Sequence, residues 1–151
     1  MNVKLIKLTK EYYNQLAEMI DEWKLDQEMN HTNHAPWAIF KNDYHDFNYY
    51  LENLEMSEPK DDMVPDSVFF LLDTERNILL GAVNIRHCLN DYLLKYGGHI
   101  GDGIDLQLPK KCVFAFLGDY IDGYAHKTDT RQVSSFISAT KHYPIYLTRI
   151  V

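Results

Sequence analysis

The chain has 151 residues, of which 46% are hydrophobic and 13% aromatic, and its formal net charge is −7. This size and composition fit one compact domain with a sizeable core, and the negative charge argues against binding to nucleic acid or to an anionic membrane. We expect no signal peptide and no membrane-spanning segment. The two cysteines lie outside any C-x-x-C motif, which favours a reducing, cytoplasmic location.

The first part of the chain predicts a strand followed by an amphipathic helix. Residues 2–8 alternate in polarity, as a half-buried strand does. Thr9 is a suitable N-cap for the helix, and Glu11 lies in its first turn. Apolar residues then recur at helical spacing, at Tyr12, Leu16, Met19, Ile20 and Trp23. The following segment, residues 26–42, is predicted to be a loop.

A second helix and a β-hairpin are predicted next. Asp43 or Asp46 can cap a helix whose apolar positions are Phe47, Tyr50, Leu51 and Leu54. The acidic segment 57–66 contains two prolines and is predicted to connect this helix to the sheet. Residues 67–72 and 78–87 have the composition of strands, and the polar turn between them indicates an antiparallel hairpin.

The remaining elements follow a short helical turn predicted at residues 90–96. Residues 97–104 predict a third strand with four glycines, which indicates a bulge or a close approach of another part of the backbone. Further on, residues 112–117 are apolar enough for a buried strand or helical turn, residues 133–139 suit a helix, and residues 143–151 suit a strand. These elements predict an α+β fold.

Residues 81–104 contain two motifs, G-A-V-N-I-R-H-C-L-N and G-G-H-I-G-D-G-I. They resemble the central β-hairpin of the GNAT N-acetyltransferases, and more closely a bacterial branch with I-R-H-x-L-N and G-G-H-I-G-x-G-I. The resemblance covers residues 1–104. It implies a single GNAT-like domain over residues 1–151, with a mixed sheet, helices on both faces and a divergent or incomplete C-terminal part, residues 105–151.

The resemblance implies that acetyl-CoA is the co-substrate. In the family, backbone groups of the third strand pair with the pantetheine arm and the acetyl carbonyl. The matching residues here are Ile100, Gly101, Asp102, Gly103 and Ile104. The family continues with an Arg/Gly-rich loop for the pyrophosphate, which needs glycines for close approach of its backbone N–H groups. This chain continues with D-L-Q-L-P-K-K-C, so Lys110 and Lys111 are the remaining candidates for the pyrophosphate.

The acceptor implied by the resemblance is an amine of a small molecule or peptide. His99 through a water, or Glu22, is a candidate base for the amine, and Tyr124 is a candidate acid for the leaving thiolate. The candidate acceptor-binding residues are Trp23, Arg86, His87 and Asn90. An equally good alternative is a structural role, in which Arg86 and Asn90 organise the loop after the strand 78–87 by hydrogen bonds. No metal is expected, because His31 and His34 lie in a predicted loop without a third well-placed ligand.

The replaced pyrophosphate loop leaves a second hypothesis open. The chain can be a non-catalytic GNAT-like module that binds a partner or forms a homodimer, without a working acetyl-CoA site. Residues 1–104 carry a net charge of −9 and residues 105–151 a net charge of +2. A reading-frame disruption or a recombination near residue 105 would also produce such a change.

Overall fold

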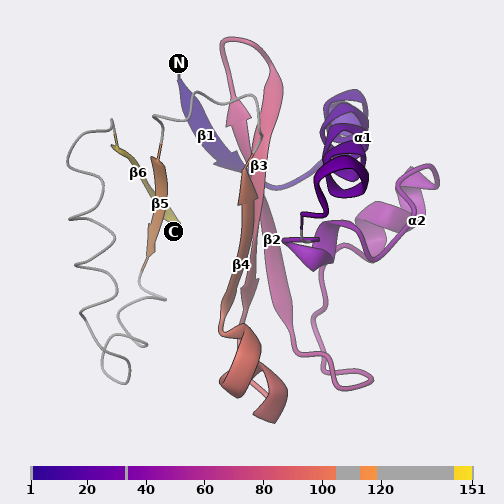
Figure 1. Ribbon diagram of the computed structural model, residues 1–151, viewed down its shortest axis with the longest axis vertical. Coiled ribbons are helices and arrows are strands. Elements are labelled where there is room, and N and C mark those ends of the chain that lie inside the picture. Colours follow the sequence, from indigo (N-terminus) through magenta and orange to yellow (C-terminus); the bar gives the residue numbers. More distant parts are fainter. Residues whose placement is uncertain (1, 33, 105–112, 119–144, 151) are drawn as a thin grey trace. The chain divides into compact units, whose positions relative to one another are not determined.

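The computed structural model describes residues 2–32, 34–104, 113–118 and 145–150, which belong to two compact units, Met1–Asp105 and Leu106–Val151. The elements of the first unit, in chain order, are β1 (Val3–Ile6), α1 (Tyr13–Asn30), α2 (Phe47–Glu52), β2 (Asp66–Asp73), β3 (Ile78–Arg86) and β4 (Ile100–Ile104) (Figure 1). Short 3₁₀ turns occur at Lys10–Tyr12 and Trp37–Ile39, and a π-helical turn at Leu93–Gly97. In the second unit, β5 (Val113–Gly118) pairs in parallel with β6 (Ile145–Ile150). The predicted α+β class is confirmed.

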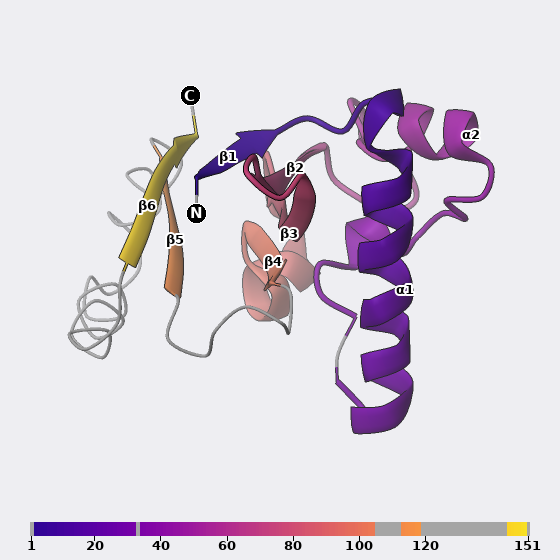
Figure 2. The same ribbon diagram turned by 90° about the horizontal axis from the view of Figure 1, so that it is seen from above.

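The four strands of the first unit form one sheet in the order β1-β2-β3-β4, and all neighbours are antiparallel. Among the described residues, the one parallel pair is β5 with β6 in the second unit, so a mixed sheet that spans the whole chain stays a prediction. Helices on both faces of the sheet likewise stay a prediction, because the described helices belong to the first unit. Figure 2 shows α1 and α2 on the same side of its sheet.

Helix α1 is longer than its sequence pattern predicts, since residues 26–30 are helical rather than part of a loop. The helix ends where His31 adopts a left-handed backbone with φ of 54° and donates its N–H to the carbonyl of Gln27 at 3.0 Å. Gln27 is itself buried, so the last turn packs against the protein. For α2, the cap is Asp46, whose side chain accepts a hydrogen bond from the backbone N–H of Tyr49.

The core lies between α1 and the sheet. The predicted stripe on α1 is confirmed, because its buried apolar residues are Leu16, Met19, Ile20 and Trp23. The sheet contributes Val68, Phe70, Leu72, Leu79 and Ala82. Tyr50 from α2 is fully buried, and its hydroxyl donates a 2.9 Å hydrogen bond to the carbonyl of Ile39. The buried Tyr50 hydroxyl thus has a hydrogen-bond partner, as a polar group in the core requires.

The glycines of β4 mark a close approach rather than a bulge. Strands β3 and β4 pair without a register shift, and the irregularity in the sheet lies instead between Leu71 and Leu72 of β2. Gly103 faces the indole ring of Trp23 and the carbonyl of Ala35. A Cβ atom at Gly103 would lie 2.9 Å from two ring atoms of Trp23, and closer still to the oxygen of Ala35. Only glycine leaves room for this contact between α1, its following loop and β4.

Tyr44 holds the segment between the helices to α1. Its hydroxyl donates a 2.6 Å hydrogen bond to Asp21, and this bond, with burial and the Asp21 charge, raises the pKa of Tyr44 to about 12. Since the folded pKa is raised, the bond stabilises the protein fully below pH 10 and is lost as the pH rises to about 12.

We therefore expect Tyr44→Phe to lower the free energy of unfolding by about 1.5–3 kcal/mol near pH 8, as for a hydrogen bond to a charged group. Urea unfolding of both proteins at several pH values measures this difference. It should shrink between pH 10 and pH 12. A difference that stayed constant over that range would contradict the assigned role of the Asp21 bond.

Candidate functional site

A cavity of about 400 Å³ lies where β2 begins and β3 ends. We call it the Arg86 cavity. Its polar lining residues are Lys41, Asp62, Asp66, Asn84, Arg86 and Asn90. Its larger apolar and aromatic lining residues are Trp37, Met56, Met63, Val64, Tyr92 and Leu93. A mainly apolar wall with a few converging polar groups is typical of a small-molecule site.

Asp66, the first residue of β2, organises the floor of this cavity. One carboxylate oxygen accepts a 2.7 Å hydrogen bond from the backbone N–H of Met56, and the other accepts one of 2.7 Å from the side-chain amide of Asn84. Asn84 is only 3% exposed, so its amide depends on this partner. The carboxylate thereby connects the loop after α2 to both β2 and β3.

Arg86 and Asn90 line the cavity and also organise the loop after β3. The Arg86 guanidinium donates to the carbonyls of Gly98, at 2.9 Å, and Gly97, at 3.3 Å. Burial lowers the pKa of Arg86, while the charge of Asp66 opposes this effect. The Asn90 amide donates to the carbonyl of Asp62 at 2.6 Å, and its oxygen accepts from a backbone N–H of the π-helical turn. Both residues therefore organise the loop by hydrogen bonds, as the structural alternative expected.

Lys41 supplies the second positive charge of the cavity. Its side chain is half-buried, and burial lowers its pKa, with the charges of Asp66 and Glu55 acting in the opposite direction. Among the described residues, its ammonium makes no hydrogen bond and no ion pair within 4 Å. A partly desolvated cation without a close counter-ion attracts the anionic group of a ligand.

His99 lies directly before β4 and has a defined ring orientation. Its Nδ1 is 2.8 Å from the backbone carbonyl of Arg86. A carbonyl oxygen only accepts hydrogen bonds, so Nδ1 carries the proton in the neutral ring and Nε2 is the basic nitrogen. The backbone N–H of Arg86 donates in return to the carbonyl of His99 at 2.8 Å. These paired contacts hold His99 at the end of the β3–β4 hairpin, next to the wall formed by Arg86.

The predicted cofactor strand and one predicted acceptor residue are brought together by the contact between Trp23 and Gly103. Trp23 is 6% exposed, and its indole nitrogen has no hydrogen-bond partner among the described residues. Glu22 precedes it on α1 and is half-buried. Asp102, between the two glycines of β4, pairs with Val83 and is exposed. The predicted site residues Lys110, Lys111 and Tyr124 lie outside the described residues.

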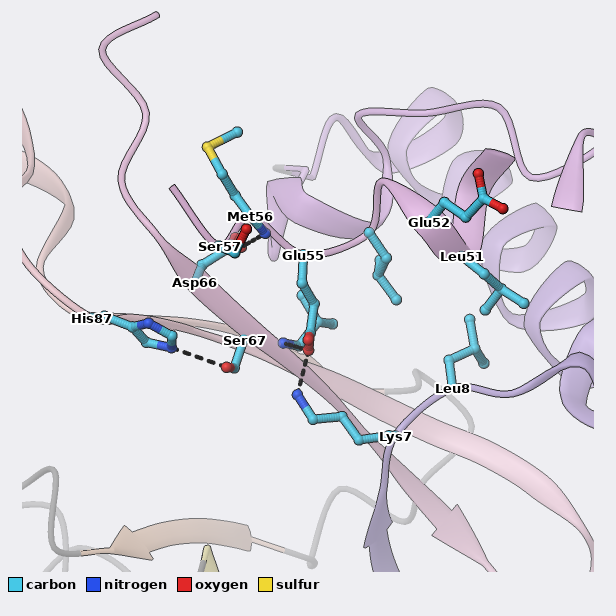
Figure 3. A pocket seen from close by; sticks show the side chains of 12 residues that line it. Lys7, Leu8, Leu51, Glu52, Glu55, Met56, Ser57, Asp66, Ser67 and His87 are labelled. Carbon is cyan, nitrogen blue, oxygen red and sulfur yellow. Dashed lines mark hydrogen bonds and ion pairs between the residues drawn. The ribbon is translucent and has the colours of Figure 1, made fainter. Parts of the chain in front are cut away.

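His87 lines a second cavity, of about 630 Å³, rather than the Arg86 cavity (Figure 3). Its Nε2 is 2.9 Å from the hydroxyl of Ser67. In the same cavity, the Glu55 carboxylate accepts a 2.6 Å hydrogen bond from the backbone N–H of Val68 and pairs with Lys7. Consecutive residues of an extended chain point to opposite sides. The structure thus separates His87 from Arg86, with which sequence reasoning had grouped it.

Sequence reasoning did not identify Lys41, Asp66 and Asn84 as site residues. One signal was available, because Asn84 interrupts the apolar run from Ile78 to Ile85 and a polar residue at such a position needs a buried partner. Lys41 lies in a loop, where a lysine is unremarkable. Lys41 and Asp66 are far apart in the sequence, so no local pattern predicts that they line the same cavity.

The histidines considered as metal ligands have other contacts. His31 ends α1, His34 packs edge-on against Phe40, and His45 hydrogen-bonds to Asp43. No cluster of three or more potential metal ligands occurs among the described residues. In the same part of the chain, no helix is both long and apolar enough to cross a membrane. No protein-family model, curated protein or solved structure matches the chain.

Proposed function

We propose that this chain is a GNAT-like protein that transfers acetyl from acetyl-CoA to an amine bound in the Arg86 cavity. One observation carries the proposal. The segment that bears the sequence resemblance, residues 81–104, includes most of the antiparallel hairpin of β3 and β4, and Arg86 and Asn90 from the same segment line a cavity next to it. A hairpin that binds the cofactor and a cavity that binds the acceptor would then lie side by side.

The arrangement of the first unit supports this proposal. Its order of elements, one strand, two helices and three strands, is the order that the resemblance implies for the N-terminal half of the family. The antiparallel sequence β1-β2-β3-β4 is compatible with the same half. Because many unrelated functions share one fold, the chemistry has to be argued from the side chains and backbone groups of the site.

Strand β4 is the proposed site of the pantetheine arm of acetyl-CoA. Among the described residues, β4 pairs with β3 only, so the backbone groups along its other edge can hydrogen-bond to an extended ligand. We assign this edge, Ile100 to Ile104, to the arm and the acetyl carbonyl. Lys110 and Lys111 remain the proposed contacts of the pyrophosphate. When bound, acetyl-CoA supplies an activated acyl group.

The proposed reaction is a direct attack of the neutral amine on the acetyl carbon, with formation of a C–N bond and loss of the C–S bond. His99 takes the proton of the amine on Nε2, through a water, because the carbonyl of Arg86 holds Nδ1 in its protonated form. Glu22 is the alternative base. Backbone N–H groups of β4 stabilise the oxyanion of the tetrahedral intermediate, and Tyr124 returns a proton to the thiolate.

Calorimetric titration of acetyl-CoA into the purified protein tests the proposal. We expect one site with micromolar affinity, both for the wild type and for His99→Gln. In an assay of thiol release with a panel of primary amines, His99→Gln should be slower by about 10²–10⁴-fold, the usual contribution of general base catalysis. Absence of binding at near-millimolar acetyl-CoA would refute the proposal.

A second candidate function is a non-catalytic GNAT-like module that forms a homodimer. The same edge of β4 favours it, since a strand edge can pair with a strand of a second copy. Size-exclusion chromatography with light scattering distinguishes the two candidates. A dimer without acetyl-CoA binding supports the module, whereas a monomer at high concentration contradicts it.

A further inference from the structure

Lys41 lies where two cavities meet. It lines the Arg86 cavity and also a neighbouring cavity of about 520 Å³. Trp37, Met56 and Met63 line both cavities as well, so Lys41 is the positively charged residue that the two share. Trp37 is 55% exposed, which leaves much of its indole surface available to a ligand. The positive charge of Lys41 is therefore flanked by the apolar side chains of Trp37, Met56 and Met63.

The carboxylates near Lys41 are already engaged elsewhere. Asp66 accepts hydrogen bonds from the backbone of Met56 and the amide of Asn84, and Glu55 is held by Lys7 and the backbone of Val68. Both carboxylates stabilise the charge of Lys41 from a distance, but neither forms an ion pair with it. An anionic group of a ligand could approach Lys41 directly and replace the water that burial removes.

We infer that the Arg86 cavity binds an amino acid, with Lys41 binding its carboxylate. This inference rests on the proposed function and names the acceptor class, because the acetylated amine would then be the α-amino group. Asp62 and Asp66 line the same cavity and would repel a dianionic phosphate, whereas they attract the ammonium of a zwitterion. Trp37, Met56 and Met63 would contact an apolar or aromatic side chain.

Three probes of one shape test the inference in the absence of acetyl-CoA: L-phenylalanine, 3-phenylpropanoate and 2-phenylethylamine. The chain has two tryptophans, so its indole N–H signals in ¹H–¹⁵N spectra report on Trp37, with the buried Trp23 as an internal reference. Lys41→Met removes the charge and keeps the length of the side chain. Lys4→Met is the matched control, since Lys4 is exposed on β1.

L-phenylalanine and 3-phenylpropanoate, the two carboxylate probes, should shift the Trp37 signal saturably. Lys41→Met should weaken the binding of both probes at least tenfold. Lys4→Met should bind as the wild type does, and 2-phenylethylamine should bind equally to all three proteins. The inference is overturned if no probe saturates, if Lys41→Met binds the carboxylates normally, or if inorganic phosphate binds more tightly than they do. Carboxylate binding without acetyl-CoA binding would refute only the proposed function, and acetylation of simple amines without carboxylate binding only the inference.

Discussion

Asp66→Ala should lower the free energy of unfolding by about 2–4 kcal/mol. The substitution removes the acceptor of two hydrogen bonds, one from the backbone of Met56 and one from the amide of Asn84. Asn84 is 3% exposed, so water cannot easily replace its lost partner. Lys41 and Arg86 would also lose the negative charge of Asp66, which stabilises their charged forms. Urea unfolding followed by circular dichroism measures the effect.

Asp66→Asn is the matched control for that prediction. The asparagine keeps the shape of the side chain and an acceptor for Met56, and the amide of Asn84 can turn to accept its new N–H. We therefore expect less than half of the destabilisation seen with alanine. Equal destabilisation by both variants would show that the charge of Asp66, rather than its hydrogen bonds, stabilises this region.

The second large effect is expected at Gly103, where alanine should destabilise the protein by about 1–3 kcal/mol. The added Cβ would overlap the ring of Trp23 and the backbone oxygen of Ala35, and a backbone atom cannot rotate away as a side chain can. Relief of this overlap requires α1 and its following loop to move away from β4. Thermal or urea unfolding measures the difference from the wild type.

Gly101→Ala is the control on the same strand, two residues away. A Cβ at Gly101 would lie 3.5 Å from Arg86 Nη2 and 3.7 Å from the Cβ of Pro36, both ordinary contacts. Because alanine also restricts the unfolded chain, this variant should be neutral or more stable by up to about 1 kcal/mol. If both variants lost similar stability, the close approach at Gly103 would not be the cause.

Several elements could be predicted from the sequence because their patterns are local. The stripe of Leu16, Met19, Ile20 and Trp23 predicted α1, since helical spacing places these residues on one buried face. The turn between β2 and β3 likewise predicted their antiparallel pairing, because a short connection leaves few alternatives. The resemblance to GNAT N-acetyltransferases identified Arg86 and Asn90, and the role assigned to them remains a prediction.

Other features depend on contacts between residues far apart in the chain. Helix α1 continues to Asn30 because Gln27 is buried and His31 adopts a left-handed backbone, neither of which a periodicity reveals. The separation of His87 from Arg86 became visible only from the cavities that they line.

The sequence by itself thus determined the α+β class, the order of the elements in the first unit and the β2–β3 hairpin, because these follow from local spacing. Only the tertiary structure decided that the sheet of the first unit is antiparallel throughout, and that Lys41 and Asp66 share a cavity with Arg86. Side chains 20 or more positions apart are brought together by packing of α1 and the loops on the sheet, and no local pattern records that packing.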